Sequence, residues 1–258
     1  MLDLFDIKNK VAVITGASSG LGADAARAFA DAGAKVALLA RRQDKLEALC
    51  SELQENGADA LVVKCDVTDL NSCKEAVDKV LDNYQTIDIL INDAGVAVRG
   101  GVDSIDEESW DFAFDVNVKG IYHMCKYVVP IMKHKEYGKI INVASVNAVI
   151  ADKSDLFIRH SYNSSKAAVV GLTRGMAASY AQYNITVNAV GPALFESEMT
   201  ADTLFKSEKF LGAYNMLNPS SRPGRKGELN GTLIYLASDA SSYVQGQFIL
   251  VDGGGAIV

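Results

Sequence analysis

The chain has 258 residues, of which 49% are apolar and 22% are charged, the composition of an ordinary globular protein. Its formal net charge of -7 argues against a nucleic-acid partner, because surfaces that bind phosphate backbones are basic. The four cysteines follow neither a zinc pattern nor a disulfide framework, and the sequence shows no leader peptide and no apolar stretch of the ~20 residues that a membrane helix needs. We therefore expect reduced thiols, no bound metal, no membrane contact and a cytoplasmic location.

Short apolar runs recur along the chain and predict strands. They cover residues 11–15, 36–40, 61–65, 87–92, 139–145, 185–190 and 248–252. Amphipathic stretches of helical length separate most of them, as expected for repeated βαβ units. This alternation predicts an α/β fold: a single Rossmann-like domain over residues 1–258, with one doubly wound parallel sheet and helices on both faces. The less regular segment 193–226 is expected to be a mobile cover over the substrate.

The first predicted strand runs directly into the glycine-rich segment TGASSGLG, which a helical stretch follows. Glycine there allows a tight turn and lets a pyrophosphate approach the backbone, while the helix N-terminus offers free N–H groups to the anion. A plain glycine-rich turn would look similar, but the position between the first strand and a long helix favours a dinucleotide site. The residues predicted to form it are Gly16, Ser18, Ser19, Gly20, Leu21 and Gly22.

The end of the second predicted strand bears on the choice of cofactor. A carboxylate at this point would accept a hydrogen bond from the ribose 2′-hydroxyl of NAD, but the strand ends in Ala40 and is followed by Arg41 and Arg42. Two guanidinium groups suit a 2′-phosphate, so we predict NADP as the cofactor, with NAD as the alternative if the arginines are merely solvated.

Two tyrosines precede a lysine by four residues, a spacing that places both side chains on one helix face. With ten tyrosines in the chain, roughly one such pair arises by chance, so spacing alone is uninformative. Tyr162 and Lys166 open a predicted helix after a strand that ends in Ser145, at the sheet edge where such folds bind ligands. Tyr122 and Lys126 lie within an apolar helical stretch, which favours packing or a subunit contact.

TGASSGLG, NDAG at 92–95, Ser145 and YNSSK at 162–166 follow one another in an order that resembles the short-chain dehydrogenase/reductase family over nearly the whole chain. The segments LFDIKNKVAVITG and PALFESEMT look most like the gluconate 5-dehydrogenase and sorbose reductase branch. The resemblance implies an NAD(P)-dependent oxidoreductase that acts on CH–OH groups and assembles as a homotetramer.

The resemblance also implies roles for individual residues. Tyr162 would be the general acid/base, and Lys166 would hold the nicotinamide ribose and lower the pKa of Tyr162. Ser145 would hydrogen-bond the substrate oxygen, and Asn117 would anchor a water on the path from Lys166 to solvent. The cofactor would also contact Asp66, Val67, Asn92, Ala94, Gly95, Pro192, Leu194 and Phe195.

Three positions depart from the family pattern. Asp93 stands where the family usually has a second asparagine, and because an ionised carboxylate only accepts hydrogen bonds, either the local bonding is rearranged or Asp93 is protonated. Ala193 replaces the usual glycine after Pro192, and Ser19 replaces the basic residue of many NADP-using members.

The residues do not identify the substrate as clearly as they identify the cofactor. The candidates for its pocket are Asn147, Phe157, His160, Phe195, Met199 and Tyr214, and the candidates for binding a substrate carboxylate are Arg99, Arg159 and His160. Trp110 and Phe112 are expected in the core. The leading hypothesis is an NADP(H)-dependent oxidoreductase acting on a ketone or secondary alcohol of a sugar, sugar acid or polyol. The alternatives are a 3-oxoacyl reductase, a hydroxysteroid dehydrogenase, and a non-catalytic dinucleotide sensor.

Overall fold

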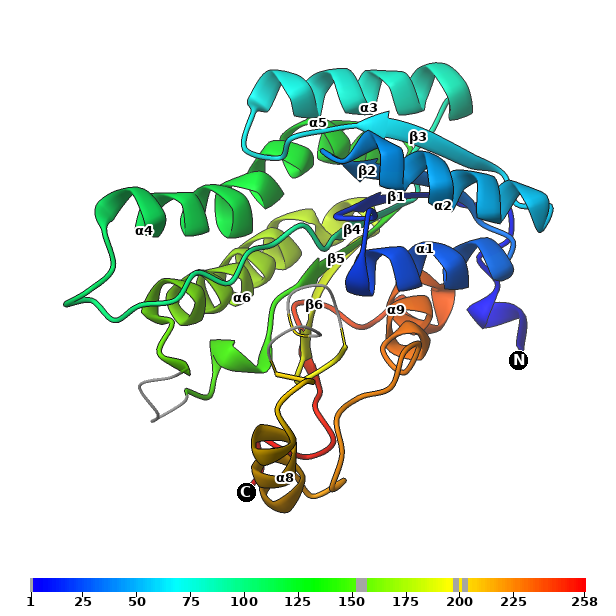
Figure 1. The fold of residues 1–258 in the computed structure, drawn as a ribbon. Helices are drawn as coiled ribbons and strands as arrows, with labels where there is room; N and C mark the ends of the chain where they lie inside the picture. Colours follow the sequence, from blue (N-terminus) through cyan, green and yellow to red (C-terminus); the bar gives the residue numbers. More distant parts are fainter. Residues whose placement is uncertain (1, 152–156, 197–199, 201–203) are drawn as a thin grey trace.

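The computed structural model describes residues 2–151, 157–196, 200 and 204–258, and its centre is one parallel sheet (Figure 1). The seven strands lie in the order β3-β2-β1-β4-β5-β6-β7, and every neighbouring pair is parallel. The strands are β1 (Val11–Thr15), β2 (Lys35–Ala40), β3 (Ala60–Lys64), β4 (Ile89–Asn92), β5 (Gly138–Val143), β6 (Ile185–Pro192) and β7 (Phe248–Val251). Each apolar run predicted to be a strand forms one, because a strand buried on both faces carries no polar alternation.

Helices follow most of the strands. The α-helices are α1 (Gly20–Asp31), α2 (Gln43–Glu55), α3 (Leu70–Tyr84), α4 (Glu107–Phe114), α5 (Gly120–His134), α6 (His160–Tyr180), α8 (Glu208–Leu217) and α9 (Asn230–Ala237). The short 3₁₀ turns are η1 (Leu2–Phe5), η3 (Val146–Ala148), η5 (Ala181–Tyr183) and η6 (Asp239–Ser241). One π-helical turn, η2 (Asp115–Lys119), joins α4 to α5.

The helices cover both faces of the sheet and create two apolar cores. Helices α1, α2 and α9 pack on one face, where Phe29, Leu46 and Leu233 are fully buried or nearly so. Helices α3, α5 and α6 pack on the other, around Val80, Met124 and Val169. The predicted doubly wound α/β fold is confirmed (Figure 1).

The strand order reverses at the centre of the sheet. The chain moves outward from β1 to β2 and β3, and then returns to place β4 on the other side of β1. In such sheets the loops at the carboxyl ends of the two central strands diverge and leave a crevice. The sequence places its glycine-rich loop after β1 and its NDAG segment at the end of β4, so both meet at this crevice.

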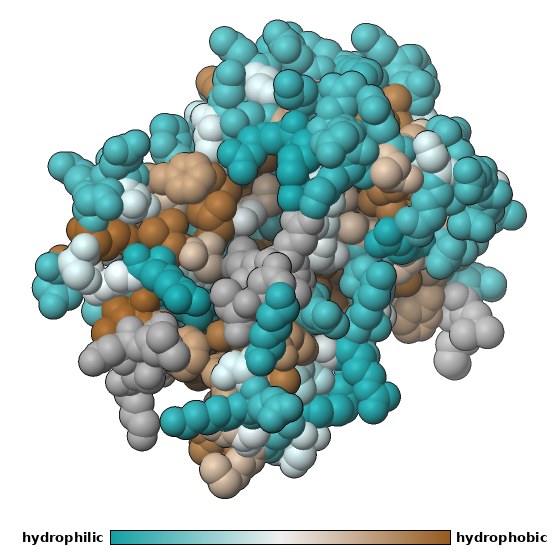
Figure 2. Space-filling view, viewed as in Figure 1, coloured by the Kyte–Doolittle hydropathy of each residue, from teal (hydrophilic) through white to brown (hydrophobic). Residues whose placement is uncertain are grey.

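The surface is uneven in character. Figure 2 shows hydrophilic side chains gathered over α2 and α3, at the top of the view.

Phe112, expected in the core, is 41% exposed because it lies on the outer side of α4, whereas Trp110 is half-buried and stacks on Phe114 with ring centroids 5.5 Å apart. Among the described helices, none has both the length and the apolar character needed to cross a bilayer.

Candidate active site

A cavity of about 680 Å³ opens at the carboxyl ends of the central strands. Most of the residues predicted to bind cofactor or substrate share its wall. They are Gly16, Ser18, Ser19, Gly20, Leu21, Arg41, Arg42, Asp66, Val67, Ala94, Gly95, Ser145, Tyr162, Lys166, Pro192, Leu194 and Phe195. Residues from distant parts of the sequence therefore meet around one space large enough for a cofactor and a small substrate.

The glycine-rich loop fits closely against the end of β4. Gly16 has a φ of +74°, a conformation that residues with a side chain rarely adopt, and a Cβ there would lie 2.9 Å from the Ala94 nitrogen. A Cβ on Gly22 would lie 2.7 Å from the Gly16 oxygen. Gly22 itself is buried beneath the loop and does not line the cavity, so its role is to permit this packing.

The two arginines after β2 border the same end of the cavity. Arg42 donates from Nη2 to the Ser18 hydroxyl at 3.0 Å and to the Ser19 hydroxyl at 2.8 Å. Arg41 and Arg42 are both exposed, and both belong to the cavity wall. The serines of the loop therefore hold one guanidinium group beside the glycine-rich segment.

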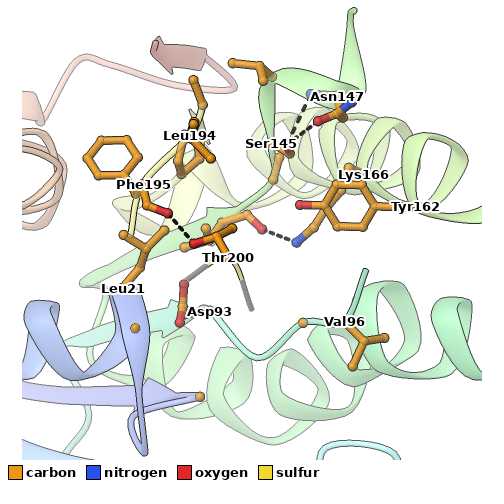
Figure 3. A pocket seen from close by; sticks show the side chains of 18 of the residues that line it. Leu21, Asp93, Val96, Ser145, Asn147, Tyr162, Lys166, Leu194, Phe195 and Thr200 are labelled. Atoms are coloured by element: carbon orange, nitrogen blue, oxygen red, sulfur yellow. Dashed lines mark hydrogen bonds between the residues drawn. The ribbon is translucent and has the colours of Figure 1, made fainter. Parts of the chain in front are cut away.

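At the other end of the cavity, Ser145, Tyr162 and Lys166 turn their polar atoms toward one another (Figure 3). Ser145 follows β5, and its hydroxyl accepts from the Asn147 N–H at 3.1 Å. Tyr162 and Lys166 lie one turn apart at the start of α6, with the Lys166 Nζ 5.8 Å from the centroid of the Tyr162 ring. Lys166 is buried and donates to the Val143 carbonyl oxygen at 2.7 Å.

Burial dominates the electrostatics of this cluster. Removal from water raises the pKa of Tyr162 above its usual value, although the hydrogen bond from Ser145 and the charge of Arg159 both lower it. The same effect lowers the pKa of Lys166 to about 8, against the opposing charge of Asp93. In the protein alone, burial therefore outweighs Ser145 and Arg159, and the pKa of Tyr162 is raised instead of lowered as the family resemblance implied.

Asn117 lies behind the cavity, in the π-helical turn η2, and is fully buried. Its Oδ1 accepts from the Val96 N–H at 2.8 Å, and its Nδ2 donates to the Val96 carbonyl and to the Ser165 hydroxyl, both at 2.9 Å. Asn117 thus ties the helix kink to the segment after β4 and to α6. The extra residue of a π-turn was not visible in the sequence, because the apolar pattern continues through it.

Asp93 is held by the glycine-rich loop. Its carboxylate accepts from the Gly22 N–H, and a Cβ on Gly22 would lie 2.7 Å from Asp93 Oδ2. Burial raises the pKa of Asp93 to about 7, opposed by the charge of Lys166 and by that hydrogen bond. The carboxylate therefore has an N–H donor, and its pKa is shifted toward the protonated form.

Asn92, like Gly22, was predicted to contact the cofactor but does not line the cavity. Its side chain is buried between β4 and β5, donates to Asn142 Oδ1 at 2.9 Å and is absent from the cavity wall. The alternation of side chains along β4 turns Asn92 toward α5, where its Nδ2 lies 3.8 Å from Cys125 Sγ, and the motif alone did not reveal this.

The substrate end of the cavity is largely apolar. Asn147, Phe157, Phe195 and Tyr214 line it as predicted, whereas His160 is exposed and its Nδ1 accepts from the Val102 N–H. Met199 lies outside the described residues. Sequence reasoning missed Phe210, which packs between Phe157 and Tyr214 with ring centroids 5.0 and 6.3 Å away. Its position four residues before Tyr214 on α8 was the available signal.

The second tyrosine–lysine pair lies away from the cavity. Tyr122 is 48% exposed, and Lys126 Nζ is 3.5 Å from its hydroxyl. Neither residue belongs to the wall. The distinction drawn from sequence context between the two pairs agrees with this arrangement.

Comparison with known proteins identifies the family. Residues 10–207 match the short chain dehydrogenase family. The chain is 36% identical to a 3-oxoacyl-[acyl-carrier-protein] reductase of Thermotoga maritima over 96% of this chain and 98% of that one. It is 33% identical to the gluconate 5-dehydrogenase of Gluconobacter oxydans over 98% and 96%.

Solved structures agree with this match. The structure of a gluconate 5-dehydrogenase from Burkholderia cenocepacia in complex with NADP and tartrate superposes with a TM-score of 0.94, at 33% identity, over 100% of this chain and 99% of that one. The shared fold and the full-length similarity lead to one conclusion: the chain belongs to the short-chain dehydrogenase/reductase family and is an NAD(P)-dependent oxidoreductase acting on CH–OH groups.

Proposed function

We propose that the protein interconverts a ketone and a secondary alcohol with NADP(H), with a sugar, a sugar acid or a polyol as the leading substrate classes. The observation that carries this proposal is the meeting of the Tyr162 and Ser145 hydroxyls and the buried Lys166 ammonium in the cavity that the glycine-rich loop also lines (Figure 3). Two hydroxyls beside a cation suit the handling of one proton at a carbonyl or alcohol oxygen.

In this mechanism the bound dinucleotide supplies the hydride chemistry. Tyr162 gives a proton to the ketone oxygen in reduction and takes it from the alcohol in oxidation, while Ser145 donates a hydrogen bond to the same oxygen. Lys166, held by the Val143 carbonyl at 2.7 Å, keeps a positive charge near the phenol. Asn117 fixes the helix turn beside Ser165 and α6, which we propose orients the proton path from Lys166.

Acid/base work at neutral pH requires a lower pKa for Tyr162 than its surroundings in the protein provide. Moving a phenol from about 10 to about 7 requires ~4 kcal/mol in favour of the phenolate. The positive ring of the oxidised dinucleotide would add to the charge of Arg159, which already lowers this pKa.

The acid/base role is tested by replacing Tyr162 with phenylalanine. The variant keeps the ring but loses the proton, so kcat should fall by about 10²–10⁴-fold while NADPH binding persists. Steady-state kinetics and titration of NADPH fluorescence measure the two quantities. A variant with unchanged kcat would remove Tyr162 from the mechanism.

The residues of the cavity fit a dinucleotide with a 2′-phosphate. The glycines clear space at the helix N-terminus, and Arg42 stands on the serines of the loop beside Arg41. Solved relatives support the choice of NADP, including the gluconate 5-dehydrogenase of Burkholderia cenocepacia in complex with NADP. NAD remains the alternative.

The cofactor proposal is tested with Arg41→Ala and Arg42→Ala. Loss of a charged hydrogen bond to the 2′-phosphate should raise the Kd for NADPH by about 10-fold or more and leave that for NADH nearly unchanged. Each variant is titrated with both cofactors, and NADH, which lacks the 2′-phosphate, is the control. Equal losses for both would contradict the role of these arginines.

Two other substrate classes rest on the same framework, a 3-oxoacyl thioester and a hydroxysteroid. The Thermotoga maritima relative favours the first of these. An NADPH-consumption screen across sugars, acyl thioesters and steroids distinguishes the classes. Failure to oxidise NADPH with any ketone, together with tight NADPH binding, would support a non-catalytic sensor.

The remaining parts of the proposal are a substrate cover and an assembly. We propose that segment 193–226, of which α8 is a described part, closes over the substrate, since Phe210 and Tyr214 of α8 line the cavity. We also propose a homotetramer in the cytoplasm. The exposed aromatic side chains of Phe112 on α4 and Tyr122 on α5 support the assembly. The four free, buried cysteines support the cytoplasmic location.

A further inference from the structure

The sequence named three basic residues as candidates for binding an anionic substrate, and the structure distinguishes them. Arg99 is exposed and outside the cavity wall. His160 is also outside the wall, with its Nδ1 engaged by the Val102 N–H. Arg159 alone of the three lines the cavity, and its guanidinium carbon lies 5.9 Å from the centroid of the Tyr162 ring.

The backbone fixes the position of Arg159. A β-bridge pairs it with Gly100, and the Gly100 N–H donates to the Ile158 carbonyl at 3.0 Å while the His160 N–H donates to the Gly100 carbonyl at 3.1 Å. Its Nε donates to the Phe157 carbonyl at 3.2 Å, which orients the guanidinium plane. The two Nη groups form no hydrogen bond or ion pair with any residue that the structure describes.

The surroundings of Arg159 make an unpaired charge costly. Phe157, Phe210 and Tyr214 form a cluster of aromatic rings that lines the same cavity as Arg159. A half-buried guanidinium group in apolar surroundings is favourable only with an anionic or hydrogen-bonding partner.

The carboxylates among the described residues of the cavity wall accept hydrogen bonds from groups other than Arg159. Asp66 accepts from Thr68 and Asp93 from Gly22, while Asp252 accepts from the N–H groups of Gly254 and Ala256. Arg159 therefore lines the cavity without a partner of opposite charge among the described residues.

We propose that the substrate is an oxo acid, and its product the matching hydroxy acid, with the carboxylate bound by the guanidinium fork of Arg159 close to the reacting carbon. The inference rests on the proposed function, because it places the ketone oxygen between Tyr162 and Ser145. In reduction the carbonyl carbon gains a hydride as NADPH becomes NADP⁺, the oxygen gains the proton of Tyr162, and the carboxylate is unchanged.

A carboxylate matches the fork better than the other candidate groups do. It accepts two parallel N–H bonds from one guanidinium, whereas a hydroxyl of a neutral sugar or polyol accepts one weaker bond. A steroid offers no charge to Arg159, and a thioester offers only a neutral carbonyl. Arg159 thus selects the acid among the substrate classes that the fold allows.

The test compares ketones that differ only in this charge. We would measure kcat/KM with NADPH for benzoylformate against methyl benzoylformate and for acetoacetate against methyl acetoacetate, in the unaltered protein and in Arg159→Leu, Arg159→Lys and Arg99→Leu. The expected acid-to-ester ratio is high in the unaltered protein, falls by at least ~10-fold in Arg159→Leu and falls less in Arg159→Lys. Arg99→Leu removes the same charge outside the wall and should leave the ratio unchanged.

An equal drop in Arg99→Leu, or an acid-to-ester ratio that Arg159→Leu leaves within ~3-fold, would overturn the proposal. Binding of mandelate against methyl mandelate to the unaltered protein with NADP⁺ needs no variant, so it decides the matter even if Arg159→Leu does not fold; equal affinities would also overturn it. Turnover of the esters with no preference for acids would leave the proposed function standing. Turnover of no ketone at all would instead remove the proposed function.

Discussion

At the scale of single residues, Asp93 is the departure with the clearest physical consequence. Its pKa is raised by burial to about 7, well above that of an exposed carboxyl. Between the unfolded value near 4 and about 7, the folded protein therefore binds more protons at this site than the unfolded chain does, and the free energy of unfolding falls as pH rises. Burial lowers the pKa of Lys166 to about 8, so this residue affects stability in a higher pH range. As pH rises from about 8 toward the pKa of lysine in the unfolded chain, the unfolded chain binds more protons than the folded protein, and the free energy of unfolding rises.

Asp93→Asn should weaken the pH dependence of the free energy of unfolding between about pH 4 and 7. The amide keeps the shape but carries no charge, so the fall in unfolding free energy between about pH 4 and 7 should shrink. The recovery of stability that Lys166 produces should begin at a lower pH, because the Asp93 charge that raises the pKa of Lys166 is lost. Denaturant unfolding at a series of pH values measures this difference between the two proteins. Parallel curves would show that Asp93 is not the titrating group.

Arg159 shows how much the sequence alone can predict about a single residue. The sequence named Arg99, Arg159 and His160 together as candidates for binding a substrate carboxylate. In the structure a backbone bridge joins Arg159 to Gly100, and Arg159 lines the cavity whereas Arg99 and His160 do not. Side-chain direction in loops depends on such long-range pairing, which no local pattern encodes.

At the scale of elements, the turn from β1 to α1 connects the sheet to the site. Gly22→Ala would bring a Cβ to within 2.7 Å of the Gly16 carbonyl oxygen and of Asp93 Oδ2. The carbonyl belongs to the backbone of the loop and yields little, so we expect a loss of about 1–3 kcal/mol in stability together with weaker NADPH binding.

Gly175→Ala is the matched control for this prediction. Gly175 is exposed within α6, and a Cβ there meets nothing within 4 Å. Alanine in an exposed helix should raise stability by about 0.5–1 kcal/mol. Thermal unfolding and NADPH titration of both variants decide the point, and a Gly22→Ala protein that matches Gly175→Ala would show that the close packing is not required.

Elements also show which parts of the fold sequence patterns predict. The strands were predicted from unbroken apolar runs because both faces of this sheet are covered. Phe112 was assigned to the core from its residue type alone, but its helix buries a different side, and Ala113 is the residue fully enclosed there. The π-turn at η2 was missed because its register shift leaves composition and local polarity unchanged.

At the scale of the whole molecule, the topology accounts for most of what the sequence predicted correctly. The order of motifs along the chain fixed which loops meet at the reversal between β1 and β4, so the Gly16 loop, Ser145 and Tyr162 were predicted to meet without any distance in hand. The substrate end was less predictable. It draws on α8 and on the segment before α6, whose placement depends on tertiary contacts such as the one between Phe157 and Phe210.

The proposed homotetramer also belongs to this scale, and exposed side chains locate one of its contacts. Phe112 on α4 is 41% exposed and Tyr122 on α5 is 48% exposed, an unusual loss of burial for two aromatic residues on neighbouring elements. We expect this surface to bury against another copy of the chain, so Phe112→Asp should shift sedimentation toward a smaller species. Leu4→Asp adds the same charge at η1, at the N-terminal end of the chain and far from α4 (Figure 1), and should leave the assembly intact. A monomer in the unaltered protein would contradict the tetramer, and an unchanged assembly in Phe112→Asp would place the contact on another surface.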